Sequence, residues 1–129
     1  MPTAIKMSLR LAATLALLLG LIMWLFTGPL PPLIYTHIAF AILVLLLAIA
    51  VLFLPTTVSG NNTTIRTLQG IAVLLAICTM LVGYLQYQGT FSGLAATLTH
   101  LILALALVSL IETTLARQSR LARQARTGM

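Results

Sequence analysis

Acidic side chains are almost absent from this chain, and charge of either sign is absent over most of its length. Among 129 residues there is one acidic residue, Glu112, beside seven lysines and arginines. No charged residue occurs between Leu11 and Ile65 or between Thr67 and Ile111. Soluble domains carry about a quarter of their residues as charged side chains. The 6% found here excludes an ordinary water-soluble domain.

Cysteine is equally scarce. Cys78 is the only one, so the chain has no second cysteine for an intrachain disulfide. It lies within an apolar stretch, where a lone cysteine behaves as a small hydrophobic residue. With one acidic residue, one cysteine and two histidines, the chain has few side chains that bind metals. A structural zinc ion needs four donors, so the sequence does not favour such a site.

Hydrophobic residues make up 60% of the chain and form four stretches that are long enough to cross a bilayer. A lipid-exposed backbone must satisfy its own hydrogen bonds, so we expect helices. They cover about residues 9–27, 33–54, 67–87 and 94–114. Short loops favour antiparallel neighbours. The predicted fold is therefore all-α: a single transmembrane domain, formed by a four-helix up-down-up-down bundle with a basic tail over 115–129.

The cations lie on one side of this arrangement. Lys6 and Arg10 flank the start of the first stretch, Arg66 lies in the second loop, and the other four arginines follow the last stretch. Cations favour the cytoplasmic side, so we expect an integral protein of the cell membrane with both termini cytoplasmic. The tail would continue the fourth helix and contact anionic membrane lipid, and the net charge of +6 then requires no nucleic acid. Glu112 is expected to pair with Arg117 or with solvent.

The two histidines occupy matching positions in the two halves of the chain. His37 opens the second apolar stretch, and His100 opens the fourth, 63 residues later. The same shift relates two pairs of small residues, Ala41 with Ala104 and Gly20 with Gly83. This repeat predicts two pseudo-symmetric helical hairpins around an axis along the membrane normal.

Both histidines are expected at one depth in the outer leaflet, since a helix rises about 1.5 Å per residue. An ionisable side chain inside a membrane points to a functional site. Two neutral imidazoles at equal depth suit the two axial positions of one haem b iron. The two alanines, one turn further along the same helix faces, would leave room for the flat macrocycle. The two glycines could do the same from the other two helices, or simply allow close helix packing.

Other roles for the histidines stay open. They could form interhelical hydrogen bonds, line a proton path or bind another metal, and Met23 and Met80 lie at depths that suit a soft copper ion. The aromatic and polar residues near the outer surface form an interfacial belt. Within this belt, Tyr35, Gln86 and Gln88 could also meet haem propionates.

On these residues the chain resembles the haem A synthase family, whose members are similar to two fused four-helix bundles with histidines opening the second and fourth helices of each. The resemblance covers about residues 9–115 as a single half, and is carried by Tyr35-Thr36-His37, the helix of Gly83, and Leu98-Thr99-His100. It implies haem b, with haem O or haem A as substrate or product, because the family oxidises a methyl group of haem O to a formyl. The catalytic half of the family has a glutamate where this chain has Ile34, so the chain is closer to the haem-b half.

We therefore expect a haem-b protein that acts in haem A biosynthesis, as an oxidoreductase, or in electron transfer beside a respiratory chain. The replacement of the family's glutamate by Ile34 leaves enzymatic activity open. The half-family size and the small residues of the spans favour a homo-oligomer or a subunit of a membrane complex. The alternative is a non-catalytic four-helix subunit that stabilises a larger complex, with the histidines bonded within the bundle.

Overall fold

The computed structural model describes residues 3–54 and 62–127, and this part of the chain is helical apart from short connections. The helices are α1 (Thr3–Ile22), which continues into a π-helical turn η1 (Met23–Thr27), α2 (Pro31–Phe53), α3 (Asn62–Tyr87) and α4 (Gly93–Thr127). The predicted all-α class is confirmed, and all four helices are long and apolar enough to cross a membrane. These are the features of an integral membrane protein. Most of the predicted second loop lies outside the described residues.

Glycine and proline set the helix boundaries on the side of the first and third connections. Gly28 has a φ of 67° and ends the π-helical turn, and Pro31 then opens α2. Proline suits the first turn of a helix because its φ is fixed and its missing N–H would have no partner there. After α3, Gly89 has a φ of 74°, a left-handed conformation that favours glycine.

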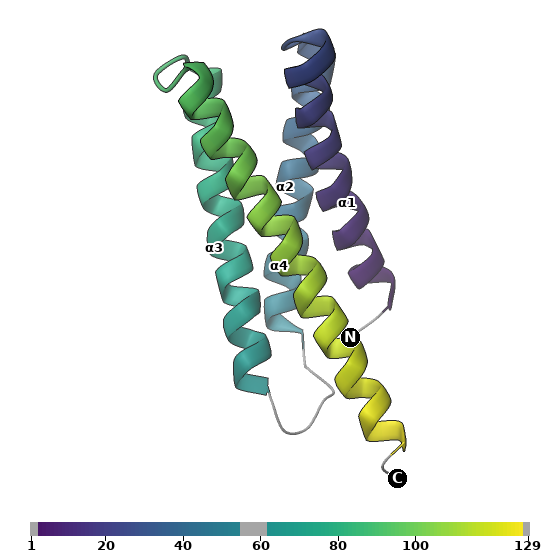
Figure 1. The fold of residues 1–129 in the computed structure, drawn as a ribbon. Helices are drawn as coiled ribbons and strands as arrows, with labels where there is room; N and C mark the ends of the chain where they lie inside the picture. The colour runs from purple at the N-terminus through teal and green to yellow at the C-terminus, as the bar shows by residue number, and fades with distance from the viewer. Residues whose placement is uncertain (1–2, 55–61, 128–129) are drawn as a thin grey trace.

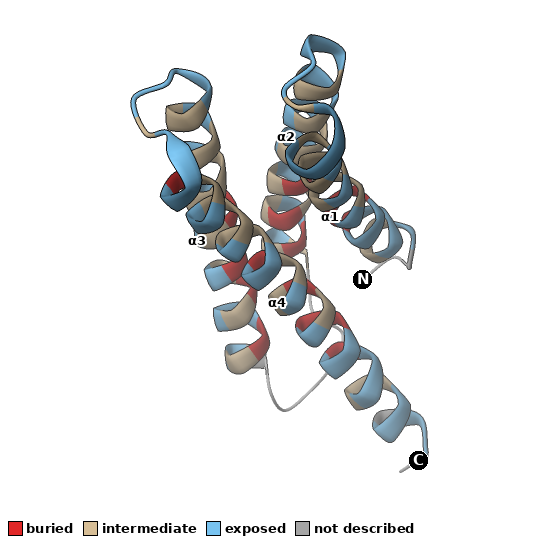
Figure 2. Ribbon diagram, turned by 45° about the horizontal axis from the view of Figure 1, so that its top comes forward, coloured by how far each residue is buried: buried red, intermediate tan, exposed pale blue. Residues whose placement is uncertain are grey.

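The described helices form two hairpins, because α1 packs mainly on α2 and α3 mainly on α4. Figure 1 shows that the hairpins approach each other near the chain termini and spread apart toward the connections at residues 28–30 and 88–92. Buried residues gather in the half near the termini (Figure 2), where alanines such as Ala12, Ala48 and Ala76 allow close helix contact. The other half has room between the hairpins.

The fourth helix is longer than a membrane span. It contains 35 residues and includes most of the basic tail that was predicted over 115–129. The prediction that this tail continues the helix is confirmed as far as Thr127. The four arginines of the tail are therefore carried on a rigid helix beyond the apolar stretch.

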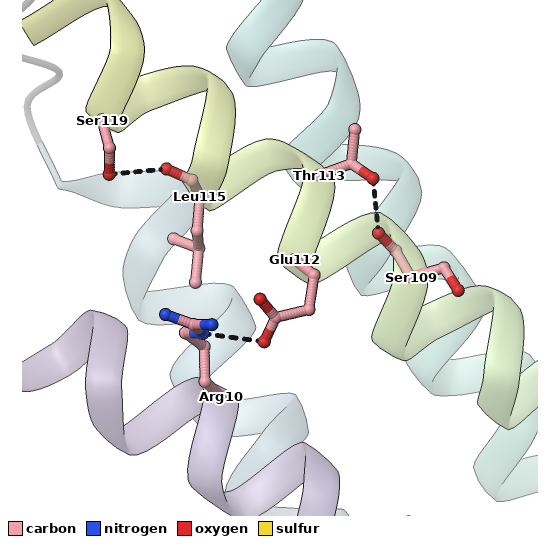
Figure 3. Close-up of polar contacts among 6 residues, drawn as sticks. All are labelled: Arg10, Ser109, Glu112, Thr113, Leu115 and Ser119. Carbon is pink, nitrogen blue, oxygen red and sulfur yellow. Dashed lines mark hydrogen bonds and ion pairs between the residues drawn. The ribbon is translucent and has the colours of Figure 1, made fainter.

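Glu112 of α4 forms an ion pair with Arg10 of α1, with 2.7 Å between Nε of the arginine and Oε1 of the carboxylate (Figure 3). Of the two expectations for Glu112, a pair with Arg117 or contact with solvent, the pair with Arg117 is wrong, because Arg10 is the partner. The pairing follows from the contact between α1 and α4, which the order of residues along the chain does not show. The two side chains are 55% and 40% exposed, so this link between the hairpins lies at the surface.

Candidate functional site

A cavity of about 610 Å³ lies between the hairpins, in the half of the molecule where they spread apart. Its wall is mostly apolar and contains both histidines. Cavities of about 300–1,000 Å³ with an apolar wall and a few polar groups are typical of binding sites for small molecules and cofactors. The size and composition of this cavity therefore suit an organic ligand.

Six of the seven residues predicted for the site line this cavity. They are His37, His100, Ala41, Ala104, Gly20 and Gly83. Tyr35 does not line it, and its side chain is 64% exposed. The structure thus brings together residues from all four helices, while Tyr35 lies outside the group.

The imidazoles of His37 and His100 lie close to each other although they come from different hairpins. Their ring centroids are 6.0 Å apart, and the ring planes are inclined by 61°. His37 is carried by α2 and His100 by α4. Both are half-buried, so the two rings share an apolar environment at the centre of the cavity.

Each glycine of the site makes room for an imidazole of the same hairpin. A Cβ atom at Gly20 would lie 3.2 Å from Cε1 of His37, and one at Gly83 would lie 2.8 Å from Cε1 of His100. Two roles were expected for the glycines, space for a macrocycle or close helix packing, and the structure shows the second, because the histidines fill the space beside them. The physical reason is the tight packing of α1 on α2 and of α3 on α4. These contacts fix where each imidazole can lie.

The Nδ1 atom of His37 lies 2.9 Å from the carbonyl oxygen of Ala16 in α1. A carbonyl only accepts, so Nδ1 carries the hydrogen and the lone pair of the neutral ring is on Nε2. Backbone carbonyls orient metal-binding histidines in this way. In the second hairpin, the backbone of Thr79 faces His100, but the contact falls short of a hydrogen bond. Nδ1 of His100 is buried without a partner among the described residues.

The Nε2 atoms are the nitrogens of the site that remain free to bind a metal. Neither forms a hydrogen bond within residues 3–54 and 62–127, and neither is sealed off as a buried atom without a partner. No group of three or more His, Cys, Asp and Glu side chains occurs in the same part of the chain. The described cavity wall therefore offers the two histidine nitrogens as metal ligands, with no Cys, Asp or Glu side chain beside them.

The cavity wall repeats the 63-residue shift of the sequence. All lining residues except Gly28, Pro29 and Val108 form pairs whose members are 63 positions apart. The pairs include His37 with His100 and also positions at which the two residues differ. The sequence suggests the duplication from only a few matched pairs. The matched cavity wall supports it further, because many more pairs of equivalent positions line the same cavity.

Thr79 and Thr97 are polar residues of the wall that were not predicted as part of the site, whereas Gln86 and Gln88 were candidates to meet haem propionates. Thr97 lines the cavity and accepts a hydrogen bond from Nε2 of Gln86, with 3.3 Å between the two atoms. Gln88 does not line the cavity, and its amide donates to the hydroxyl of Tyr84. Ile34 lies three residues before His37 and so on the same face of the helix. Applying the 63-residue shift to Ile34 gives Thr97, so the sequence could have predicted this residue. Met23, matched with Gln86, also lines the cavity.

Comparison with known proteins identifies no relative. No family model matches the chain, and neither a curated protein nor a solved structure matches it. Function is therefore inferred from the cavity, the two histidines and the residues that hold them.

Proposed function

We propose that this chain is a membrane haem protein that would bind one haem b in the cavity between its hairpins, with His37 and His100 holding the iron. The observation that carries the proposal is the pair of imidazoles 6.0 Å apart in an apolar cavity of cofactor size. Their Nε2 atoms have no other partner among the described residues. Electron transfer within the membrane is the role that these features favour.

The separation of the rings fits two nitrogens on opposite sides of one metal atom. With a metal–nitrogen bond of about 2.1 Å, two trans imidazoles have centroids roughly 6.5 Å apart. The observed 6.0 Å lies about 0.5 Å below this distance. A bare metal ion would need further protein donors, and a porphyrin brings four nitrogens of its own. A site with two protein nitrogens therefore fits haem better than zinc.

Residues around the two histidines have three roles in this site. The carbonyl of Ala16 holds the Nδ1–H tautomer of His37, which directs the lone pair of Nε2 away from the backbone. Gly20 and Gly83 allow the imidazoles to lie against the neighbouring helices. The mostly apolar wall lowers the polarity around the two nitrogens. When bound, haem would supply a one-electron redox centre, which suits electron transfer.

Oxidation of haem O to haem A has less support within the same site. Ile34, which stands where the resembling family has its glutamate, lines the cavity. Among the described residues, the wall holds neither a carboxylate nor a cationic side chain. The wall therefore supplies no carboxylate that accepts a proton when a methyl group is oxidised.

A structural subunit without a cofactor is the second candidate. The hydrogen bond between His37 and Ala16 favours it, because it is an internal bond of the kind that such a subunit would use. His100 argues against it, since its Nδ1 is buried without a partner among the described residues and its Nε2 is equally free. A purely structural histidine would be expected to satisfy at least one of its nitrogens.

We further propose that the helices form an up-down-up-down bundle with both termini in the cytoplasm. The matched pairs of the cavity wall support two equivalent hairpins, and each hairpin would enter and leave the membrane on the same side. Lys6, Arg66 and the arginines of the tail then all lie on the cytoplasmic side. In this orientation the cavity lies in the outer leaflet.

A visible absorption spectrum tests the haem site. The protein, purified in a mild detergent and titrated with haem, should give a low-spin spectrum with narrow ferrous bands. His37→Ala and His100→Ala should each remove the low-spin bands while the helices stay intact by circular dichroism. Tyr35→Ala is the matched control, because this aromatic residue opens the same helix but lies outside the cavity. A low-spin spectrum that survives both histidine substitutions would overturn the assignment.

A further inference from the structure

The two walls of the cavity differ in polarity although they are related by the 63-residue shift. His37 with His100, Gly20 with Gly83 and Ala41 with Ala104 are the same in both hairpins. Nearer the connections, Trp24 and Tyr87 are both aromatic side chains with one polar group, whereas three other pairs are apolar in the first hairpin and polar in the second. These pairs are Leu21 with Tyr84, Met23 with Gln86, and Ile34 with Thr97.

We infer that Gln86, Thr97 and Tyr84 bind the polar edge of an amphipathic ligand, whose carboxylates lie against the second hairpin. This inference rests on the proposed haem site, because haem is a flat apolar ring with carboxylates along one edge. A symmetric wall would accept a ligand equally well in two orientations related by the pseudo-two-fold axis. The polar groups of α3 and α4 remove this equivalence and select one orientation.

The hydrogen bonds of these residues leave donors available. Gln86 uses one amide hydrogen on the hydroxyl of Thr97, and that hydroxyl donates in turn to the carbonyl of Gly93, with 3.2 Å between the oxygens. The second amide hydrogen of Gln86 has no partner among the described residues. The hydroxyl of Tyr84 accepts from Gln88 and keeps its own hydrogen. Two neutral donors thus remain for a carboxylate.

The position of these donors suits a charged group. Gln86 lies one residue before the end of α3, and Thr97 lies in the first turns of α4, so both lie in the part of the wall nearest the connection of this hairpin. A carboxylate is costly to bury without compensation, and hydrogen bonds from these residues would compensate for part of that cost. The first hairpin has no such donor at the matched positions, where Met23 and Ile34 stand.

Binding of haem and of haem dimethyl ester tests the inference. The ester keeps the ring and the iron and removes both carboxylate charges. The wild-type protein should bind the diacid at least about tenfold more tightly, as expected for one or more hydrogen bonds to a charged group. Gln86→Met, which introduces the residue of the matched position, and Thr97→Val, which removes the hydroxyl at similar size, should each reduce this preference. Both variants should keep the low-spin spectrum, since the histidines are unchanged.

The control is Leu81→Met, a substitution at an exposed position of α3 outside the cavity wall, which should leave the preference for the diacid unchanged. An equal affinity of the wild type for both compounds would overturn the inference, as would an unchanged preference in both Gln86→Met and Thr97→Val. If neither compound binds, the proposed haem site is wrong and this inference fails with it. If both bind with a low-spin spectrum but without preference, the haem site stands and the inference alone is wrong.

Discussion

The contact between Gly83 and His100 predicts a large effect of a single methyl group. In Gly83→Ala, the new Cβ would lie 2.8 Å from Cε1 of His100, whereas ordinary contact begins at 3.4 Å. The imidazole must move, and it cannot move without changing the position of its Nε2. The same substitution at Gly20 brings the Cβ to 3.2 Å from His37, a smaller conflict that also strains the hydrogen bond to Ala16.

These distances set the expected order of effects. Overpacking of a filled site costs about 1–3 kcal/mol, which corresponds to a fall of roughly 3–10 °C in the melting temperature. We expect the melting temperature of Gly83→Ala to fall by an amount in this range and that of Gly20→Ala to fall by less. Haem affinity should fall at least about tenfold in Gly83→Ala, because a bound site tolerates a displacement of only about 0.5 Å.

Gly70 provides the matched control, since it is a helical glycine of α3 with nothing within 4 Å of the position that a Cβ would take. Gly70→Ala should leave the melting temperature and the haem affinity unchanged, or raise stability slightly through its better helix propensity. The measurements are thermal circular dichroism in detergent and a haem titration. Equal behaviour of Gly83→Ala and Gly70→Ala would refute the contact between Gly83 and His100.

Three further predictions concern the rest of the molecule. Reporters fused at the C-terminus and inserted in the connection at residues 88–93 should report opposite sides of the membrane; the same side for both would refute the proposed topology. Glu112→Gln should lower the melting temperature slightly, and adding Arg10→Gln should cause no further fall because the ion pair is already lost; additive falls would contradict the pairing. Gln69→Met should raise the melting temperature, since the amide of Gln69 is 4% exposed and neither of its polar atoms has a partner among the described residues; a lower melting temperature would show that the amide is bound.

The membrane-spanning helices could be predicted from the sequence because hydrophobicity acts over about 20 residues at a time. The same signal could not give the helix ends. α1 begins at Thr3, before the charged residues Lys6 and Arg10, and α4 continues to Thr127 through the basic tail. Hydrophobicity marks the part of a helix that lies in lipid, whereas the helix itself ends where capping or turn residues interrupt it.

The composition of the site was predictable in part. The shift that matches His37 with His100 identified residues that do meet in one cavity. The position of Tyr35 could also have been derived, because residues two apart on a helix do not share a face and Tyr35 stands two before His37. The π-helical turn at residues 23–27 carries no comparable signal in the sequence. It contributes Met23 to the cavity wall, and π-turns recur at functional sites.

The sequence pattern does not predict which side chains of neighbouring helices contact each other. The distance from a glycine to an imidazole depends on how closely two helices approach, and small residues permit that approach without specifying its register. The sequence therefore assigns Gly20 and Gly83 to the cavity but leaves open whether they make room for a macrocycle or allow close packing, and the structure shows them packed against the histidines. The pairing of Glu112 with Arg10 depends in the same way on how α1 and α4 approach each other.

The haem content of the purified protein tests the central claim most directly. The chain should be expressed in cells supplied with haem precursors, purified in mild detergent, and assayed for haem and protein in the same sample. We predict one haem b per chain in the wild type and almost none in the His37→Ala, His100→Ala double variant. A wild-type protein that carries no haem, even after haem is added to the purified sample, would contradict the account.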